Sequence, residues 1–249
     1  MAVLYCGKSI CVGIKKQLEM VMEVVEMAIS KIMIKDALRY IGMPSHQTSS
    51  PMSQQIEDTY KELEQLNASK YIYNHFPITI SEEVVSFEYT KLQVKSKDLA
   101  KLLANCNRCY VLAATLGQEA DKQISRRQKT DMLEAVILDA CASVLVDKIC
   151  DDFEMKITEE ISKNEFLTMR FSPGYGDVPL DVQQSILDIL NATKQIGISL
   201  TKTNMLLPTK SVTAFIGISH QKEERQKSCE ACSLVQSCIY RKRGDQCGL

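Results

Sequence analysis

Apolar positions recur at helical spacing in four stretches of the chain. The first spans residues 14–41 and predicts one long helix or two in series, with a break near Ser30. Gly42-Met43-Pro44 ends this stretch, and a polar linker follows over residues 46–52. The other three stretches predict helices at 53–67, 125–161 and 181–192, and the one at 125–161 has the strongest periodicity.

Strand patterns lie between these helices. Residues 70–94 are rich in β-branched and aromatic side chains that partly alternate, which predicts two or three strands. A short helix is expected at 97–103, a buried strand at 108–115, and two alternating strands at 198–201 and 211–218 with a turn at Pro208. Because helices and strands do not alternate regularly and no repeat is visible, the pattern predicts an α+β fold with a largely antiparallel, twisted sheet and flanking helices.

Composition narrows the class of protein. The chain has 249 residues, 45% of them hydrophobic, and a net charge of -1, which suits one large or two small domains with a real core. No basic stripe is present, which argues against nucleic acid as the main partner. No apolar run approaches about 18 residues, so no membrane span is expected. Ten cysteines without a recognisable export signal indicate reduced thiols or metal ligation in a cytoplasmic protein.

The stretch Arg-Phe-Ser-Pro-Gly-Tyr-Gly-Asp-Val-Pro at 170–179 is the densest group of special residues in the chain. Pro173 fixes its own φ, and Gly174 and Gly176 can adopt positive φ, so a shaped loop is expected. The Asp-Val-Pro at 177–179 predicts the start of the following helix. The planar fork of Arg170 suits a carboxylate or phosphate. The alternative is an ordinary surface connection between a strand and a helix.

A carboxylate interrupts the apolar pattern of the 125–161 helix. Asp139 is expected to project among Ala135, Ala142 and Val146, where a charge is costly unless a cation or a hydrogen-bond donor meets it. Asp139 at a solvated edge, or capping a neighbouring backbone, is the alternative.

Several kinds of catalytic chemistry are not indicated. The three histidines, His46, His75 and His220, are not paired at metal-binding spacing and cannot be matched to a nucleophile and a third group. Neither a Rossmann glycine motif nor a P-loop is present. The candidate site is therefore expected to bind a ligand rather than to carry out acid–base chemistry.

The loop and the 40 residues that follow resemble the activation (S-adenosylmethionine-binding) domain of cobalamin-dependent methionine synthase. The similarity continues upstream through Thr115-Leu116-Gly117 and the 125–161 helix to Leu38-Arg39-Tyr40-Ile41-Gly42, a start similar to that of free-standing members, and so covers about residues 34–218. The matching residues in and after the loop are Arg170, Ser172, Pro173, Gly174, Tyr175, Pro179, Gln183, Ile186, Leu190, Ile196, Gly197, Leu200, Thr201, Met205, Pro208, Ser211 and Val212.

The resemblance implies that the domain binds S-adenosylmethionine and donates its methyl group to reduced cobalamin, which is itself the nucleophile and needs no general base. It implies that Arg170 holds the methionyl carboxylate and that Asp139, where the family has a Glu, meets the α-ammonium. The backbone of Ser172, Pro173, Gly174 and Tyr175 would face the adenine, with Tyr175 nearest the corrin as the catalytic residue. Two departures stand out: Ile216 and Gly217 replace an aromatic pair of the family, and no counterpart of an early Asp is found.

The resemblance also implies partners. The chain lacks the D-x-H-x-x-G that supplies an axial His to cobalamin, so the cobalamin must be held by a separate methionine synthase fragment or another corrinoid protein. A flavodoxin or ferredoxin is expected as electron donor. The expected organisation is an N-terminal helical segment and linker at 1–52, an S-adenosylmethionine-binding activation domain at 53–219, and a cysteine-rich tail at 220–249. Two alternative functions are an iron–sulfur redox activator of a corrinoid protein and a non-catalytic S-adenosylmethionine sensor.

Four thiols crowd into the C-terminal tail. Cys229, Cys232, Cys238 and Cys247 are spaced as zinc or [4Fe–4S] ligands could be. The alternative is a set of unliganded thiols.

Overall fold

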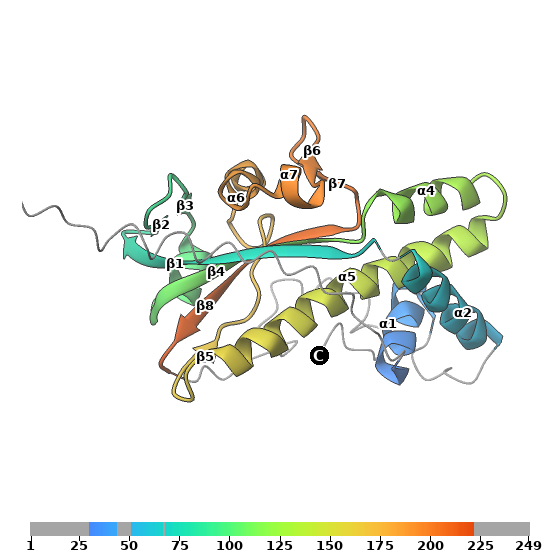
Figure 1. Ribbon diagram of the computed structural model, residues 1–249, viewed down its shortest axis with the longest axis horizontal. Coiled ribbons are helices and arrows are strands. Elements are labelled where there is room, and N and C mark those ends of the chain that lie inside the picture. Colours follow the sequence, from blue (N-terminus) through green and yellow to red (C-terminus); the bar gives the residue numbers. More distant parts are fainter. Residues whose placement is uncertain (1–29, 44–50, 67, 222–249) are drawn as a thin grey trace, which may run out of the picture.

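The computed structural model describes residues 30–43, 51–66 and 68–221 (Figure 1). One six-stranded sheet, in the order β3-β2-β1-β4-β8-β5, has antiparallel pairing throughout and helices on both faces, which confirms the predicted α+β class. The elements are α1 (Lys31–Ile41), α2 (Pro51–Gln65), β1 (Lys70–Ser81), β2 (Val84–Phe87), β3 (Gln93–Lys95), α3 (Lys97–Leu102), β4 (Cys106–Thr115), α4 (Gln118–Arg127), α5 (Met132–Glu160), β5 (Phe166–Leu167), α6 (Val182–Leu190), α7 (Ala192–Ile196), β6 (Ser199–Leu200), β7 (Leu206–Leu207) and β8 (Ser211–Ser219).

Strand β4 lies at the centre of the sheet and is buried on both faces. Its side chains alternate, so that Tyr110 and Leu112 point to one side and Val111 to the other. The first side packs against α1, α2, α4 and α5, and the second against α3, α6 and α7, as Figure 1 shows for α5 below the sheet and α6 and α7 above it. The molecule therefore has three layers and two cores.

The helix predicted at 125–161 is two helices. The chain leaves α4 after Arg127 and re-enters a helix at Met132, and Asp131 caps the new start by accepting a hydrogen bond from the Glu134 N–H at 3.0 Å. The single-helix prediction was wrong because apolar periodicity continues across this corner, whereas the cap residue breaks the backbone geometry. The 29 residues of α5 run along one face of the sheet and contact β4, β5 and β8, and Phe153 of α5 also meets Tyr71 and Tyr73 of β1.

The start and the end of α1 agree with the sequence pattern. Ser30 accepts a hydrogen bond from the Met33 N–H at 3.3 Å, and Gly42 ends the helix with a φ of 81°. Residues 14–29 of the predicted helical stretch lie outside the described residues. Four side chains of α1 share one core with the sheet and α5: Met33, Ile34, Ala37 and Leu38.

Candidate functional site

The loop at 170–179 follows β5, the strand at one edge of the sheet. After β5 the chain continues beside β8, where the Thr168 N–H donates to the Gly217 carbonyl at 2.9 Å and Phe171 forms a bridge with Phe215. The chain then folds back on itself, because the Tyr175 N–H donates to the Ser172 carbonyl at 3.0 Å. Val178 closes the loop by accepting from the Gly174 N–H at 2.8 Å. These hydrogen bonds hold the loop backbone in a defined turn conformation, as its sequence predicts.

The loop is also fastened to α3. Gly176 has a φ of 52°, and a Cβ atom there would collide with the Asp98 carboxylate. Asp177 accepts hydrogen bonds from the Ser96 hydroxyl and from the N–H groups of Lys97 and Asp98, the latter two at 2.8 and 3.2 Å. The hydrogen bond from Ser96 lowers the pKa of Asp177 most, and the bonds from Lys97 and Asp98 lower it further.

The prediction that Asp177 and Pro179 start the following helix was wrong. Helix α6 begins at Val182, while Asp177 serves the N-terminus of α3. A carboxylate can cap any helix N-terminus that lies close to it in space, whereas sequence spacing indicates only the helix that follows it in the chain. Asp181, in the cap position of α6, makes no side-chain capping bond.

Arg170 leaves the base of the loop and reaches α5. Its Nη1 lies 2.9 Å from Asp151 Oδ1 and 2.7 Å from Glu154 Oε1, and its side chain is 21% exposed. Asp147 lies one helical turn before Asp151, on the same face of α5. A guanidinium has five N–H donors, so two contacts through Nη1 leave donors for another anion.

The surroundings of Arg170 are rich in carboxylates. Burial raises the pKa of Asp147, and although Arg170 opposes this, the neighbouring Asp151 raises it further. Burial likewise raises the pKa of Asp36 on α1, which pairs with Arg39 at 3.3 Å. Among the described residues, four carboxylates thus lie around the two guanidinium groups of Arg170 and Arg39, and carboxylates gathered in this way can bind a cationic group of a ligand.

Two tyrosines stand at the rim of this cluster. Tyr175 is 59% exposed and meets the Phe171 ring edge-on, with the ring centroids 6.1 Å apart. Tyr40 at the end of α1 is 48% exposed, and its hydroxyl lies 3.5 Å from Asp147 Oδ2. Burial raises the pKa of Tyr40, and Asp147 and Tyr175 add to the effect, although Arg39 opposes it. Helix α1 therefore contributes to the site beside the loop.

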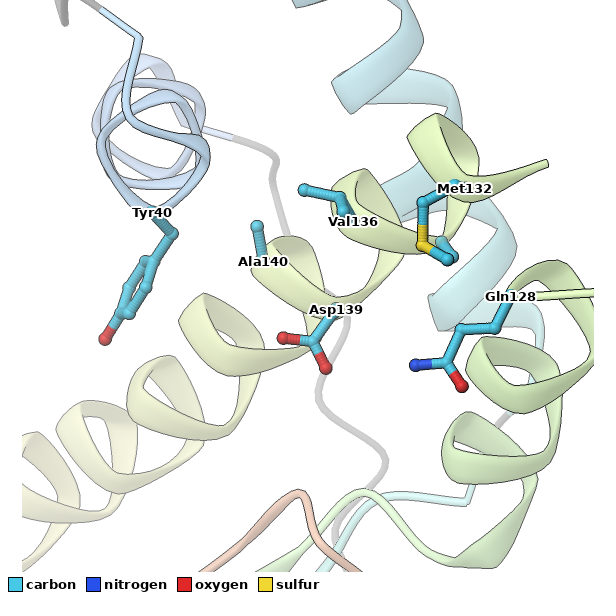
Figure 2. A pocket seen from close by; sticks show the side chains of 7 residues that line it. Tyr40, Gln128, Met132, Val136, Asp139 and Ala140 are labelled. Carbon is cyan, nitrogen blue, oxygen red and sulfur yellow. The ribbon is translucent and has the colours of Figure 1, made fainter.

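Asp139 lies elsewhere. It is exposed, forms an ion pair with Lys210 at 2.9 Å, and lines a hollow of about 180 Å³ with Tyr40, Val136 and Ala140 (Figure 2). The expectation that its carboxylate is surrounded by apolar side chains was wrong, because Asp139 lies on the solvent side of α5 between buried neighbours. Twelve residues of helix, about 18 Å, separate Asp139 from Asp151, so the structure does not bring Asp139 and Arg170 together.

The positions that depart from the family pattern lie inside the core. Ile216 is fully buried beneath α5. A Cβ atom at Gly217 would lie 2.5 Å from Leu103 Cδ2 and 2.6 Å from Cys106 Sγ, so no aromatic side chain fits there. The sheet at this point cannot present an aromatic ring to a ligand.

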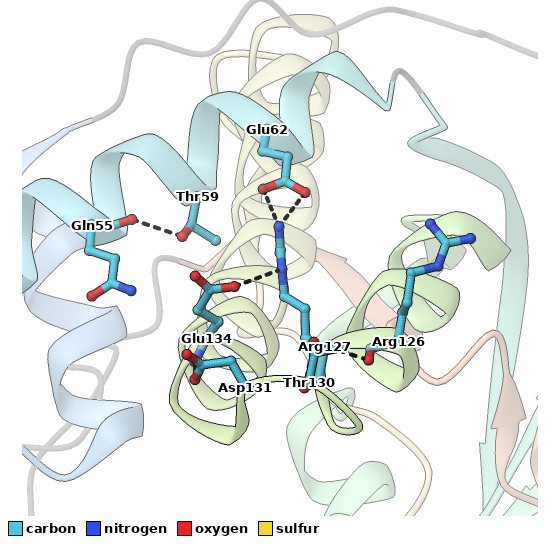
Figure 3. Close-up of polar contacts among 8 residues, drawn as sticks. All are labelled: Gln55, Thr59, Glu62, Arg126, Arg127, Thr130, Asp131 and Glu134. Atoms are coloured by element: carbon cyan, nitrogen blue, oxygen red, sulfur yellow. Dashed lines mark hydrogen bonds and ion pairs between the residues drawn. The ribbon is translucent and has the colours of Figure 1, made fainter.

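A second hollow, of about 380 Å³, lies between α2, α4 and α5 (Figure 3). Arg127 lies between two carboxylates there, with Nη2 2.5 Å from Glu62 Oε2 and Nε 3.6 Å from Glu134 Oε2. The two ion pairs link α4 to α2 and to α5 and partly neutralise the charges of the hollow. We therefore assign this hollow a structural role.

The four tail cysteines, Cys229, Cys232, Cys238 and Cys247, lie outside the described residues, and their metal binding stays a prediction. Within the described ranges, no group of three or more His, Cys, Asp or Glu side chains could hold a metal ion. In the same ranges no helix combines the length and the apolarity that a membrane crossing requires.

Sequence reasoning missed Asp36, Tyr40, Asp147, Asp151 and Glu154. The signal that could have found three of them is the spacing of carboxylates at 147, 151 and 154, which places them on one helix face. Only the fold places Asp36 and Tyr40 beside them.

Comparison with known proteins agrees with this architecture. Residues 106–243 match the family model described as vitamin B12 dependent methionine synthase, activation domain, and the chain belongs to that family. The crystal structure of the MetH reactivation domain bound to AdoHcy is similar, with a TM-score of 0.56 and 14% sequence identity over 92% of this chain and 88% of that chain. At that identity the likeness shows the fold alone. No curated protein sequence matches this chain.

The cap made by Asp177 yields a first prediction. Asp177→Ala removes three hydrogen bonds at the start of α3 and should lower the melting temperature, and the loss should shrink as the pH falls through the lowered pKa of Asp177. Asp181→Ala is the matched control, because Asp181 makes no capping bond. Equal melting temperatures for the two variants would contradict the role given to Asp177.

Asp147 yields a prediction about pH. Because its folded pKa is raised above the ordinary 3.8, its contribution to stability is complete below that value and is lost as pH rises through the folded pKa. Asp147→Asn should therefore gain stability relative to the wild type as pH rises from 4 to 7 in urea denaturation series. The groups facing Asp147 are Tyr40, Arg170, Asp151 and Asp36. A difference that does not vary with pH would contradict the burial of its charge.

Proposed function

We propose that this protein is a stand-alone reactivation module that binds S-adenosylmethionine and donates its methyl group to reduced cobalamin held by a partner protein. The observation that carries the proposal is Arg170, held among the carboxylates of α5 at the base of the loop that carries the exposed Tyr175. Membership of the activation-domain family and the AdoHcy bound to the similar MetH domain support it.

The charges of the ligand match those of the site. S-adenosylmethionine carries one carboxylate and two cationic centres, the α-ammonium and the sulfonium. The fork of Arg170 suits the carboxylate, and the carboxylates of α5 around it suit the two cations. A cation beside Asp147 would also relieve the cost of its buried charge.

The carboxylate that meets the α-ammonium is, in this proposal, Asp147 rather than Asp139. Asp147 lies on the face of α5 that Arg170 reaches, whereas Asp139 is already paired with Lys210 about 18 Å from Asp151. The backbone of Ser172, Pro173 and Gly174 remains the proposed surface for the adenine.

Methyl transfer needs positioning and no base. The reduced cobalt supplies an electron pair that becomes the new cobalt–carbon bond, while the pair of the broken sulfur–methyl bond stays on sulfur and leaves a neutral thioether. The exposed Tyr175 is proposed to face the corrin of the docked partner. A flavodoxin or ferredoxin would keep the cobalt reduced.

The iron–sulfur activator and the non-catalytic sensor remain alternatives. The first depends on the tail cysteines, which lie outside the described residues, and the second would retain ligand binding without methyl transfer.

Titration with S-adenosylmethionine by calorimetry tests the binding. The wild type should give a saturable heat, and Arg170→Ala should weaken binding by about 2 kcal/mol, roughly 30-fold, because a charge-assisted bidentate contact is lost. Arg170→Lys should bind with intermediate affinity, since it keeps the charge and loses the fork.

Arg108→Ala is the control, because Arg108 on β4 pairs with Glu165 and not with the carboxylates that contact Arg170. Absence of saturable heat at millimolar ligand would contradict the proposed function. Unchanged affinity in Arg170→Ala, with a normal melting temperature, would show that the carboxylate binds elsewhere.

A further inference from the structure

Tyr40 has an unusual position for a residue outside the part of the chain that matches the family model, residues 106–243. Tyr40 comes from α1 and lines the hollow on α5 together with Val136 and Ala140 (Figure 2). Its hydroxyl lies 3.5 Å from Asp147 Oδ2, further along α5. About half of the side chain remains exposed. The Arg39 guanidinium lies over one face of the ring, 5.6 Å from its centroid, and the exposed part of the ring stands beside the carboxylate cluster.

A second ring completes the arrangement. Tyr175 adds to the rise in the pKa of Tyr40, and its ring meets the Phe171 ring edge-on with the centroids 6.1 Å apart. The two rings belong to different elements, α1 and the 170–179 loop, and the Arg170 cluster lies with them on one side of α5.

The sheet offers no aromatic ring here. Ile216 is buried, and the space beside Gly217 is filled by Leu103 and Cys106. In the described part of the chain, Tyr40 and Tyr175 are the exposed aromatic side chains beside the cluster, so a cationic ligand centre there can meet their π faces. Aromatic faces attract cationic centres such as quaternary ammonium groups, and a sulfonium has the same charge and a similar soft surface.

We propose that Tyr40 is a specificity-determining residue, whose ring binds the sulfonium of S-adenosylmethionine and so distinguishes it from the neutral thioether product. This inference rests on the proposed function. It adds a role for α1, and it explains how a site without an aromatic ring at positions 216 and 217 recognises the charge that must be present before transfer. Release of the product is favoured because the attraction disappears with the charge.

Parallel titrations with S-adenosylmethionine and S-adenosylhomocysteine test the inference. Tyr40→Leu should bind S-adenosylmethionine about tenfold more weakly and leave S-adenosylhomocysteine affinity unchanged, because only the first carries the cation. Tyr40→Phe should keep both affinities within about twofold, since the ring is retained. Tyr89→Leu, which removes a tyrosine that is 88% exposed on the β2–β3 connection, is the control and should change neither.

Several results would overturn the inference. Equal weakening of both ligands in Tyr40→Leu would indicate a general loss of the site, and no weakening would exclude Tyr40 from it. A loss in Tyr40→Phe as large as in Tyr40→Leu would assign the effect to the hydroxyl and Asp147 instead of the ring. If the wild type binds neither ligand, the proposed function itself fails, and the inference fails with it.

Discussion

The pairing of β4 with β1 on one side and β8 on the other is the interaction on which the rest of the structure depends. It buries Leu112 and Val111 on opposite faces and so creates the two cores. It also leaves the far edge of β8 open for the segment after α5. That segment pairs with β8 through Phe171, and the pairing places Arg170 against α5.

The electrostatic character of the site follows from this placement. Arg170 meets carboxylates that α5 carries on successive turns, and α1 adds Asp36. Burial raises the pKa of Asp147 and of Asp36, although Arg170 opposes the first shift and Arg39 opposes the second. Carboxylates gathered in this way, with the exposed Tyr40 and Tyr175 at their rim, are suited to a ligand that brings its own cations.

The sequence indicated most of the architecture, because periodicity and turn residues are local signals. The strands at 70–94, 108–115 and 211–218, the break near Ser30 and the turn around Gly174 were all readable from neighbouring residues. The α4–α5 corner was missed because apolar spacing continues through it, and Asp131 alone marks the break.

The site was harder to predict, because its parts come from distant segments. Arg170 and the loop were found through a compact motif. Asp139 was selected because its neighbours in the sequence are apolar, but in the structure its side chain is exposed and pairs with Lys210. Tyr40 and Asp147 are 107 residues apart, and nothing in their neighbours shows that they meet. Asp177 caps a helix 80 residues earlier in the chain, and the local sequence does not show this because only the tertiary fold brings the two segments together.

Transfer of the methyl group is the most direct test of the whole account. The full chain would be incubated with S-adenosylmethionine carrying a labelled methyl group, a strong reductant and a cobalamin-loaded methionine synthase fragment, while methylcobalamin is followed by absorbance and label. The account predicts labelled methylcobalamin in proportion to S-adenosylhomocysteine formed, and none without this chain. Tight binding of S-adenosylmethionine with no methylcobalamin under full reduction would contradict it and would leave a sensor in its place.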